Sequence, residues 1–160
     1  YLDLRRSIMA NPMYGQNKFD SALSDTPRLI VGPEFGFGDD NAEVENGQVI
    51  NSSAVSIPAG TLVERVALLV TTVGAGGTAG TTDFDIGYDG DPDFFLSDVD
   101  HNAGFLGTVD NVIFQGNDDT SKQCSKYFSA ANVIQAKCIA KSATSGKARI
   151  LVWTSDLAAV

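Results

Sequence analysis

The sequence predicts an all-β domain built as an antiparallel β-sandwich. Short runs rich in β-branched and aromatic residues recur along the chain, and several alternate apolar with polar residues at the period of two that is typical of a strand. The one run that also fits a helical stripe has no helix cap before it. With 160 residues, of which 43% are apolar and 19% are charged, the chain suits one domain with its own core.

The segment before Gly47 differs in texture from the rest. We expect residues 1–46 to form an extended N-terminal arm and residues 47–160 to form the sandwich. Prolines and glycines interrupt the segment, yet large apolar residues are spread through it: Tyr14, Phe19, Leu23, Leu29, Ile30, Val31, Phe35 and Phe37. Such a segment suits an arm lying on another protein surface; the alternative is an arm folded back on its own domain. The candidate interface residues are Tyr14, Phe19, Leu23, Phe35 and Phe37.

Three strands are predicted before residue 90. Val49–Ile57 and Leu62–Val73 are dense in β-branched residues. Thr81–Tyr88 has the cleanest alternation. Its predicted inward residues are Thr82, Phe84, Ile86 and Tyr88, and its predicted solvent-facing residues are Thr81, Asp83, Asp85 and Gly87. The connection Gly74–Thr82 (GAGGTAGTT) cannot pack a core and is predicted to be a flexible loop. Its glycines do not form a phosphate-binding loop, because neither Lys-Ser/Thr nor a helix follows them.

Four further strands are predicted at Val109–Gln115, Tyr127–Ser129, Asn132–Lys141 and Lys147–Thr154. The predicted inward residues of the last two are Ile134, Ala136, Cys138 and Ala140, then Ala148, Ile150 and Val152. Because the link Ser142–Gly146 is short and made of small residues, we expect these two strands to form a hairpin. Seven or eight strands at this spacing are typical of a sandwich.

The formal net charge of −9 limits the partners of the chain. An acidic surface repels nucleic-acid phosphates and anionic lipid headgroups, so we expect neither a nucleic acid nor a membrane as a partner. The longest apolar run, around Val66–Val70, is far shorter than the ~20 residues of a membrane-spanning helix. The charge has a second interpretation, which is that it only keeps the protein soluble.

Cys124 and Cys138 are the only cysteines, too few for a disulfide scaffold. Buried free thiols are the favoured interpretation, with one bridge as the alternative. Nothing at the start of the chain resembles a secretion signal. Met9 opens the string MANPMYGQN, which looks like a natural start, and this leaves Tyr1–Ile8 as an upstream extension or a start-site ambiguity.

Candidate chemistry is sparse, and we expect no enzyme, no cofactor and no bound metal. His101, the only histidine, lies in a polar loop beside Asp98 and Asp100 without a positioned catalytic partner. The acidic residues of 83–93 could offer oxygens to calcium, but the closing glutamate of an EF-hand is missing, so a solvated acidic turn is predicted. Trp153 and Tyr88 could stack a sugar ring, although a core or interface role is favoured.

Three phrases of the sequence resemble small head-decoration (cement) proteins of tailed bacteriophages: IPAGTLVERVALLVTT, TTDFDIGYDGDPDFF and NVIQAKCIAKSATSGKARILVW. The opening MANPMYGQNKFD also resembles phage virion proteins with an extended N-terminal arm. The resemblance covers Met9–Leu157 and rests on structural motifs, so it assigns no single functional residue. It implies a jelly-roll-like antiparallel β-sandwich with an extended N-terminal arm, frequently trimeric, on the capsid shell.

On this resemblance, the expected function is that of a capsid decoration or cement protein, which binds the outer shell and stabilises contacts between capsid subunits. The expected partners are the major capsid protein and further copies of the chain, in a homotrimer. The expected location is the capsid surface of the virion, after synthesis in the host cytoplasm. The alternative is a carbohydrate- or receptor-binding β-sandwich module of a virion tail or fibre, which would need an exposed aromatic platform at Trp153 or Tyr88.

Overall fold

A computed structural model of the chain describes residues 27–75, 83–100, 112–115, 125–141 and 143–157. These residues form nine β-strands, and no helix among them could cross a membrane. In chain order the strands are β1 (Arg28–Gly36), β2 (Val49–Ile57), β3 (Thr61–Ala75), β4 (Asp83–Tyr88), β5 (Asp91–Asp100), β6 (Val112–Gln115), β7 (Lys126–Phe128), β8 (Asn132–Cys138) and β9 (Ser145–Asp156). The predicted all-β class is confirmed.

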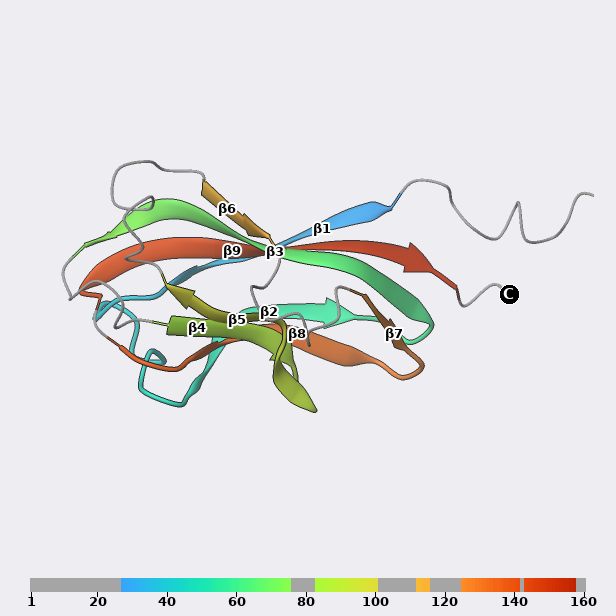
Figure 1. The fold of residues 1–160 in the computed structure, drawn as a ribbon, viewed down its shortest axis with the longest axis horizontal. Coiled ribbons are helices and arrows are strands. Elements are labelled where there is room, and N and C mark those ends of the chain that lie inside the picture. The colour runs from blue at the N-terminus through green and yellow to red at the C-terminus, as the bar shows by residue number, and fades with distance from the viewer. Residues whose placement is uncertain (1–26, 76–82, 101–111, 116–124, 142, 158–160) are drawn as a thin grey trace, which may run out of the picture.

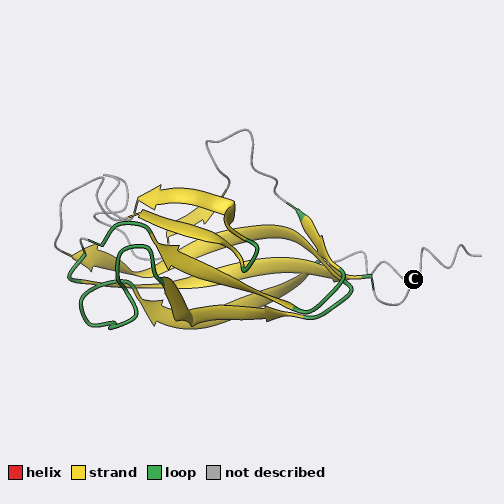
Figure 2. Ribbon diagram, turned by 90° about the horizontal axis from the view of Figure 1, so that it is seen from below, coloured by secondary structure: helices red, strands yellow, loops and turns green. Residues whose placement is uncertain are grey.

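The strands form two antiparallel sheets that stack face to face (Figure 1). Sheet A has the order β1-β9-β3-β6, with β7 paired to another part of β3, and sheet B has the order β2-β8-β4-β5. The chain repeatedly crosses between the sheets, while β4 and β5 pair directly as a hairpin within sheet B. Figure 2 shows that strands dominate the described chain and that short loops join several of them. Two sheets wound in this order form a jelly roll, as predicted.

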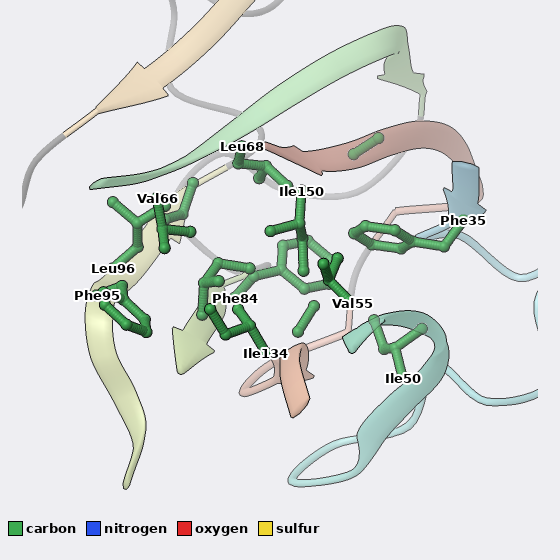
Figure 3. Close-up of a cluster of buried hydrophobic side chains, with 14 of the residues drawn as sticks. Phe35, Ile50, Val55, Val66, Leu68, Phe84, Phe95, Leu96, Ile134 and Ile150 are labelled. Atoms are coloured by element: carbon green, nitrogen blue, oxygen red, sulfur yellow. The ribbon is translucent and has the colours of Figure 1, made fainter. Parts of the chain in front are cut away.

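The core lies between the two sheets, where apolar side chains from both meet (Figure 3). Its largest fully buried side chains include Ile50, Ile86, Ile134 and Ile150. Each such side chain stabilises the fold by roughly 1.5–3 kcal/mol relative to exposure. The alternation predicted for β8 is confirmed, because Ile134, Ala136 and Cys138 are all buried.

The predicted boundary between arm and sandwich at residues 46 and 47 is wrong. Strand β1 is part of sheet A and pairs with β9. Phe35 and Phe37 are 3% and 2% exposed and belong to the core, so they are not interface anchors. The edge of the Phe37 ring meets Phe84 of sheet B, with the ring centroids 5.6 Å apart. The prolines misled the prediction, since β1 is an edge strand, where proline is tolerated at a bulge.

The predicted hairpin of the last two strands is also wrong. Strand β8 lies in sheet B and β9 in sheet A, so the short link between them crosses from one sheet to the other. The crossing is held by hydrogen bonds from the Thr144 amide to the Ala75 carbonyl (2.8 Å) and from the Phe37 amide to the Gly146 carbonyl (3.0 Å). Gly146 is required here, because a Cβ atom would lie 2.2 Å from the Phe37 ring.

The acidic segment at residues 89–93 is only partly a turn. Asp89 and Gly90 connect β4 to β5, while Asp91 already belongs to strand β5, which was not predicted. Pro92 fits because β5 is the edge strand of sheet B. The prediction of a solvent-facing Asp85 is wrong as well, since this residue is only 8% exposed.

Several predictions concern residues outside the described ranges. They are the arm residues Tyr14, Phe19 and Leu23, the loop at residues 76–82, His101, and Cys124. An arm formed by residues 1–26 therefore stays a prediction.

Replacing Phe37 with alanine is expected to destabilise the domain by about 3–5 kcal/mol, because it leaves a cavity between the two sheets. Urea unfolding followed by Trp153 fluorescence measures this loss. Leu29→Ala is the control, since Leu29 lies on the same segment but is 45% exposed; its cost should be about 1 kcal/mol or less. Equal costs for the two variants would contradict the placement of Phe37 in the core.

Candidate docking surface

The outer face of sheet A is unusually apolar for a solvent-facing sheet. Strands β3 and β9 carry apolar residues on both faces, whereas a sheet with one wet face normally alternates apolar with polar residues. In β9, Ile150 and Val152 point into the core, so Leu151 and Trp153 point outward. In β3, Val66 and Leu68 are buried in the core, so Ala67 and Leu69 point outward. The outward side chains of both central strands are therefore apolar, with Leu69 and Trp153 half-buried and Ala67 and Leu151 buried.

Strand register assembles these outward residues into one patch, which we call the outer band. Leu29 and Val31 of β1 pair with Trp153 and Leu151 of β9. On the other side of β9, Leu151 pairs with Ala67 of β3. Residues paired directly across two antiparallel strands share a face. The outer band therefore consists of Leu29, Val31, Ala67, Leu69, Leu151 and Trp153.

The edge of the outer band at β1 is its most exposed part. Leu29 is 45% and Val31 is 54% exposed, and with Tyr127 of β7 at 50% they are the exposed large apolar residues of the described chain. Because β1 is the outermost strand of sheet A, the backbone side that faces away from β9 is not covered by another strand of the sheet. Apolar side chains beside an open strand edge favour docking of another protein chain.

A bulge limits this open edge to the first half of β1. The register with β9 shifts between Val31 and Glu34, at Gly32 and Pro33. Gly32 lies against the facing sheet, where a Cβ atom would be 2.7 Å from Val55, and its carbonyl accepts a hydrogen bond from Arg149 Nη1 (3.2 Å). Proline and bulges are devices that prevent strands from pairing edge to edge. Residues 28–31 are therefore the part of β1 that a partner could pair with.

The charged groups around the outer band are engaged by neighbouring side chains. Glu34 lies 3.5 Å from Lys147 and 3.7 Å from Arg149. A hydrogen bond from Thr71, together with the two cations, lowers the pKa of Glu34. The guanidinium of Arg65 stacks on the Trp153 ring, 3.7 Å from its centroid. Because one carboxylate faces three cations among these residues, an approaching protein surface meets a small excess of positive charge on this face.

The outer face of sheet B is polar and acidic by comparison. Asp85 of β4 lies near Asp93 and Asp98 of β5, and its cross-strand partner on β8 is Lys137. Asp85 accepts a hydrogen bond from the Asp98 amide (3.1 Å) at a bulge where Asp98 has a φ of 52°. This carboxylate therefore has a structural role, which is to hold the bulged amide of β5.

The aromatic residues considered for sugar binding are already engaged. Tyr88 meets the edges of Phe94 and Phe128, with ring centroids 5.5 Å and 5.4 Å away, and Lys126 Nζ lies over its ring. Trp153 carries Arg65 on one face. No group of three or more His, Cys, Asp or Glu residues among the described ones could hold a metal ion. The arrangement is better suited to protein docking than to stacking a sugar ring.

The exposed apolar residues of β1 differ from the residues predicted to form an interface. Two of its five candidates, Phe35 and Phe37, are in the core, while Leu29 and Val31, which belonged to the same apolar set, are exposed. The outer band could have been found from the run Ile150–Trp153, because four consecutive apolar residues place apolar side chains on both faces of a strand.

Comparison with known proteins gives a fold and no family. No protein-family model and no curated protein matches the chain. A chain in the acidic stable capsid structure of Helicobacter pylori bacteriophage KHP30 is similar, with a TM-score of 0.55 and 20% identity over 81% of this chain and 89% of that one. A chain in the capsid asymmetric unit of cyanophage Pam1 has a TM-score of 0.49 and 15% identity over 81% and 86%. The first similarity shows that this jelly roll also occurs in a phage capsid.

Replacing Asp85 with asparagine is expected to make the domain more stable at pH 7. Burial raises the pKa of Asp85 above its ordinary value of 3.8, and the carboxylates of Asp93 and Asp98 add to this, against the hydrogen bond from the Asp98 amide. The ionised form therefore costs stability at neutral pH, and this cost disappears as the pH falls through the raised pKa. Asparagine keeps the acceptor oxygen without the charge.

The stability advantage of D85N over the wild type should thus shrink as the pH is lowered from 7 toward 4. Urea unfolding at a series of pH values measures it. Asp89→Asn, in the exposed β4–β5 turn, controls for the change in net charge. An advantage that stayed constant or grew on acidification would show that burial does not disfavour the Asp85 carboxylate.

Proposed function

We propose that the chain is a structural protein of a bacteriophage capsid, and within the capsid a decoration protein that binds the outer shell and stabilises contacts between capsid subunits. The observation that carries this proposal is the outer band, an apolar patch on one face of the jelly roll with its exposed edge at Leu29 and Val31. The similarity in fold to a chain of the KHP30 phage capsid supports the setting. The proposed role is mechanical, since the outer band is suited to contact with another protein surface.

The mechanism follows from burial of the outer band. Apolar area removed from water contributes ~25 cal/mol per Å², and part of this is lost to the entropy of association, so one copy binds with limited strength. A shell offers many equivalent sites, and a protein that contacts two subunits at once resists their separation by the free energy of its own binding. The acidic outer face of sheet B would then remain toward solvent.

The N-terminal segment is the second attachment element in this proposal. Residues 1–26 precede the open edge of β1 and contain Tyr14, Phe19 and Leu23. Their partners would be the major capsid protein and further copies of the chain, in a homotrimer on the capsid surface of a virion assembled in the host cytoplasm. Large apolar residues gain roughly 1.5–3 kcal/mol each on full burial, which favours their insertion into a partner surface.

The Val31→Asp variant tests the outer band. A charge buried against the shell without a partner should weaken binding at least tenfold, because such a charge costs more than about 1.4 kcal/mol. The measurement is cosedimentation of the full chain with capsid shells that lack it, over a range of chain concentrations. Electron cryomicroscopy of the saturated shells then shows which face of the domain lies on the capsid.

Ser56→Asp is the matched control, since Ser56 is an exposed residue of β2, the edge strand of the other sheet. It should bind as the wild type does. Equal binding by both variants would move the contact away from the outer band, and a wild-type chain that binds no shell at all would refute the capsid role.

A further inference from the structure

A hollow opens at the end of the sandwich where the described chain begins. Its walls come from three strands of sheet A and one turn: Arg28 and Ile30 of β1, Thr61 and Thr154 of β3 and β9, and Pro58 of the β2–β3 turn. In Figure 1 this is the end where β1 enters and β9 leaves. The hollow is distinct from the outer band, because Ile30 and Thr154 point toward the space between the sheets.

The walls of the hollow are fixed before anything binds. Thr154 Oγ1 donates a hydrogen bond to the Arg28 carbonyl (3.3 Å), which ties β9 to β1 at the rim. The Gly60 amide donates to the Phe128 carbonyl, and the Leu157 amide donates to the Gly60 carbonyl, both at 2.8 Å. These bonds hold the β2–β3 turn against β7 and the end of β9. A preformed site needs little ordering when a ligand enters.

The size and lining of the hollow suit one large apolar side chain. Its volume is about 220 Å³. An apolar cavity of about 150 Å³ in a protein can hold a benzene ring. Ile30 and Pro58 supply apolar contacts, and Arg28 and Asp156 bring one charge of each sign to the lining. A phenylalanine flanked by polar or charged residues matches this combination.

The sequence contains such a residue in the segment before β1. Phe19 stands between Lys18 and Asp20, whose charges are opposite to those of Asp156 and Arg28. The 26 residues before Pro27 hold Tyr14, Phe19 and Leu23 and are too few to build a core of their own. The hollow and this segment therefore complement each other in size, polarity and charge.

The segment that reaches the hollow is expected to come from another copy. Thr26 precedes a proline, a position that favours extended conformations, so the sequence favours a segment that continues the direction of β1. To fill its own hollow, the segment would have to reverse within the few residues between Phe19 and Arg28. A neighbouring copy can present Phe19 without this reversal.

We propose that the hollow between β1, the β2–β3 turn and β9 is a receptor for the N-terminal segment of a second copy of this chain, with Phe19 as the inserted side chain. This inference deepens the proposed function, because it names the partner of the N-terminal segment. It is tested in solution without capsids, so it can fail while shell binding through the outer band stands.

The test is a complementation between two variants of the full chain. Phe19→Ala removes the inserted ring, and Ile30→Trp fills the hollow from its own wall. The wild type is expected to self-associate in analytical ultracentrifugation, and each variant alone should associate at least tenfold more weakly. An equimolar mixture should form a heterodimer, since the intact segment of I30W can enter the intact hollow of F19A.

Val31→Trp is the matched control for Ile30→Trp, because it places the same side chain on the next residue with the opposite orientation. It should leave self-association unchanged. Gln16→Ala serves in the same way for Phe19→Ala. If V31W abolished association and I30W did not, copies would meet through the outer band, and the proposal would be overturned.

A peptide measurement keeps the proposal falsifiable if I30W is poorly folded. A synthetic peptide of residues 12–26 should bind the full-length F19A chain in isothermal titration calorimetry, and the same peptide with alanine at position 19 should bind at least tenfold more weakly. Absence of peptide binding to F19A would overturn the proposal. So would a wild-type chain that stays monomeric, since that would place the segment on its own domain or on the shell alone.

Discussion

The domain depends on strand β9 lying inside sheet A, with β1 on one side and β3 on the other. This double pairing joins the first described strand to the last. It also places β9 inside the sheet, with one face toward the core and the other toward the outside. Ile150 and Val152 complete the core on one face, while Leu151 and Trp153 create the outer band on the other. The same strand thus supplies both the stability of the fold and its candidate docking surface.

The two sheets divide the electrostatic character of the molecule between them. On sheet A, Glu34 offsets part of the positive charge of Lys147 and Arg149, so the surface around the apolar patch is not acidic. On sheet B, the neighbouring carboxylates of Asp85 and Asp93 raise the cost of bringing another acidic surface near. For a chain with a net charge of −9, this division directs association toward one face and leaves the other hydrated.

The sequence alone predicted the fold class and the strands that have one polar face. In such strands apolar and polar residues alternate, and this alternation shows which face is buried. Strand β8 is the clearest case, with Ile134 and Ala136 inward as predicted. Strands β1 and β5 were missed because Pro33 and Pro92 read as breaks, although edge strands tolerate proline. The sheet to which β9 belongs could not be predicted either, since a five-residue link can close a hairpin or cross between sheets, and only the packing of Gly146 against Phe37 distinguishes them.

The candidate surface was less predictable than the fold. Phe37 and Val31 lie on the same stretch of chain and are both large and apolar, yet one is buried and the other is 54% exposed. The bulge between them, at Gly32 and Pro33, arises where β1 pairs with β9, and these two strands are far apart in the sequence. Residue types alone therefore show which residues of such a segment are large and apolar. They do not show whether those residues are buried in the core or exposed to a partner.

The place where the chain enters sheet A has a geometric consequence for any assembly of this protein. The start of β1 and the hollow beside Arg28 and Ile30 lie at the same end of the sandwich. Copies that join through this end would have these ends at a common centre and their opposite ends pointing outward. Growth of a linear filament would need a donor and an acceptor at opposite ends. The docking proposed for the N-terminal segment therefore favours small closed clusters over filaments.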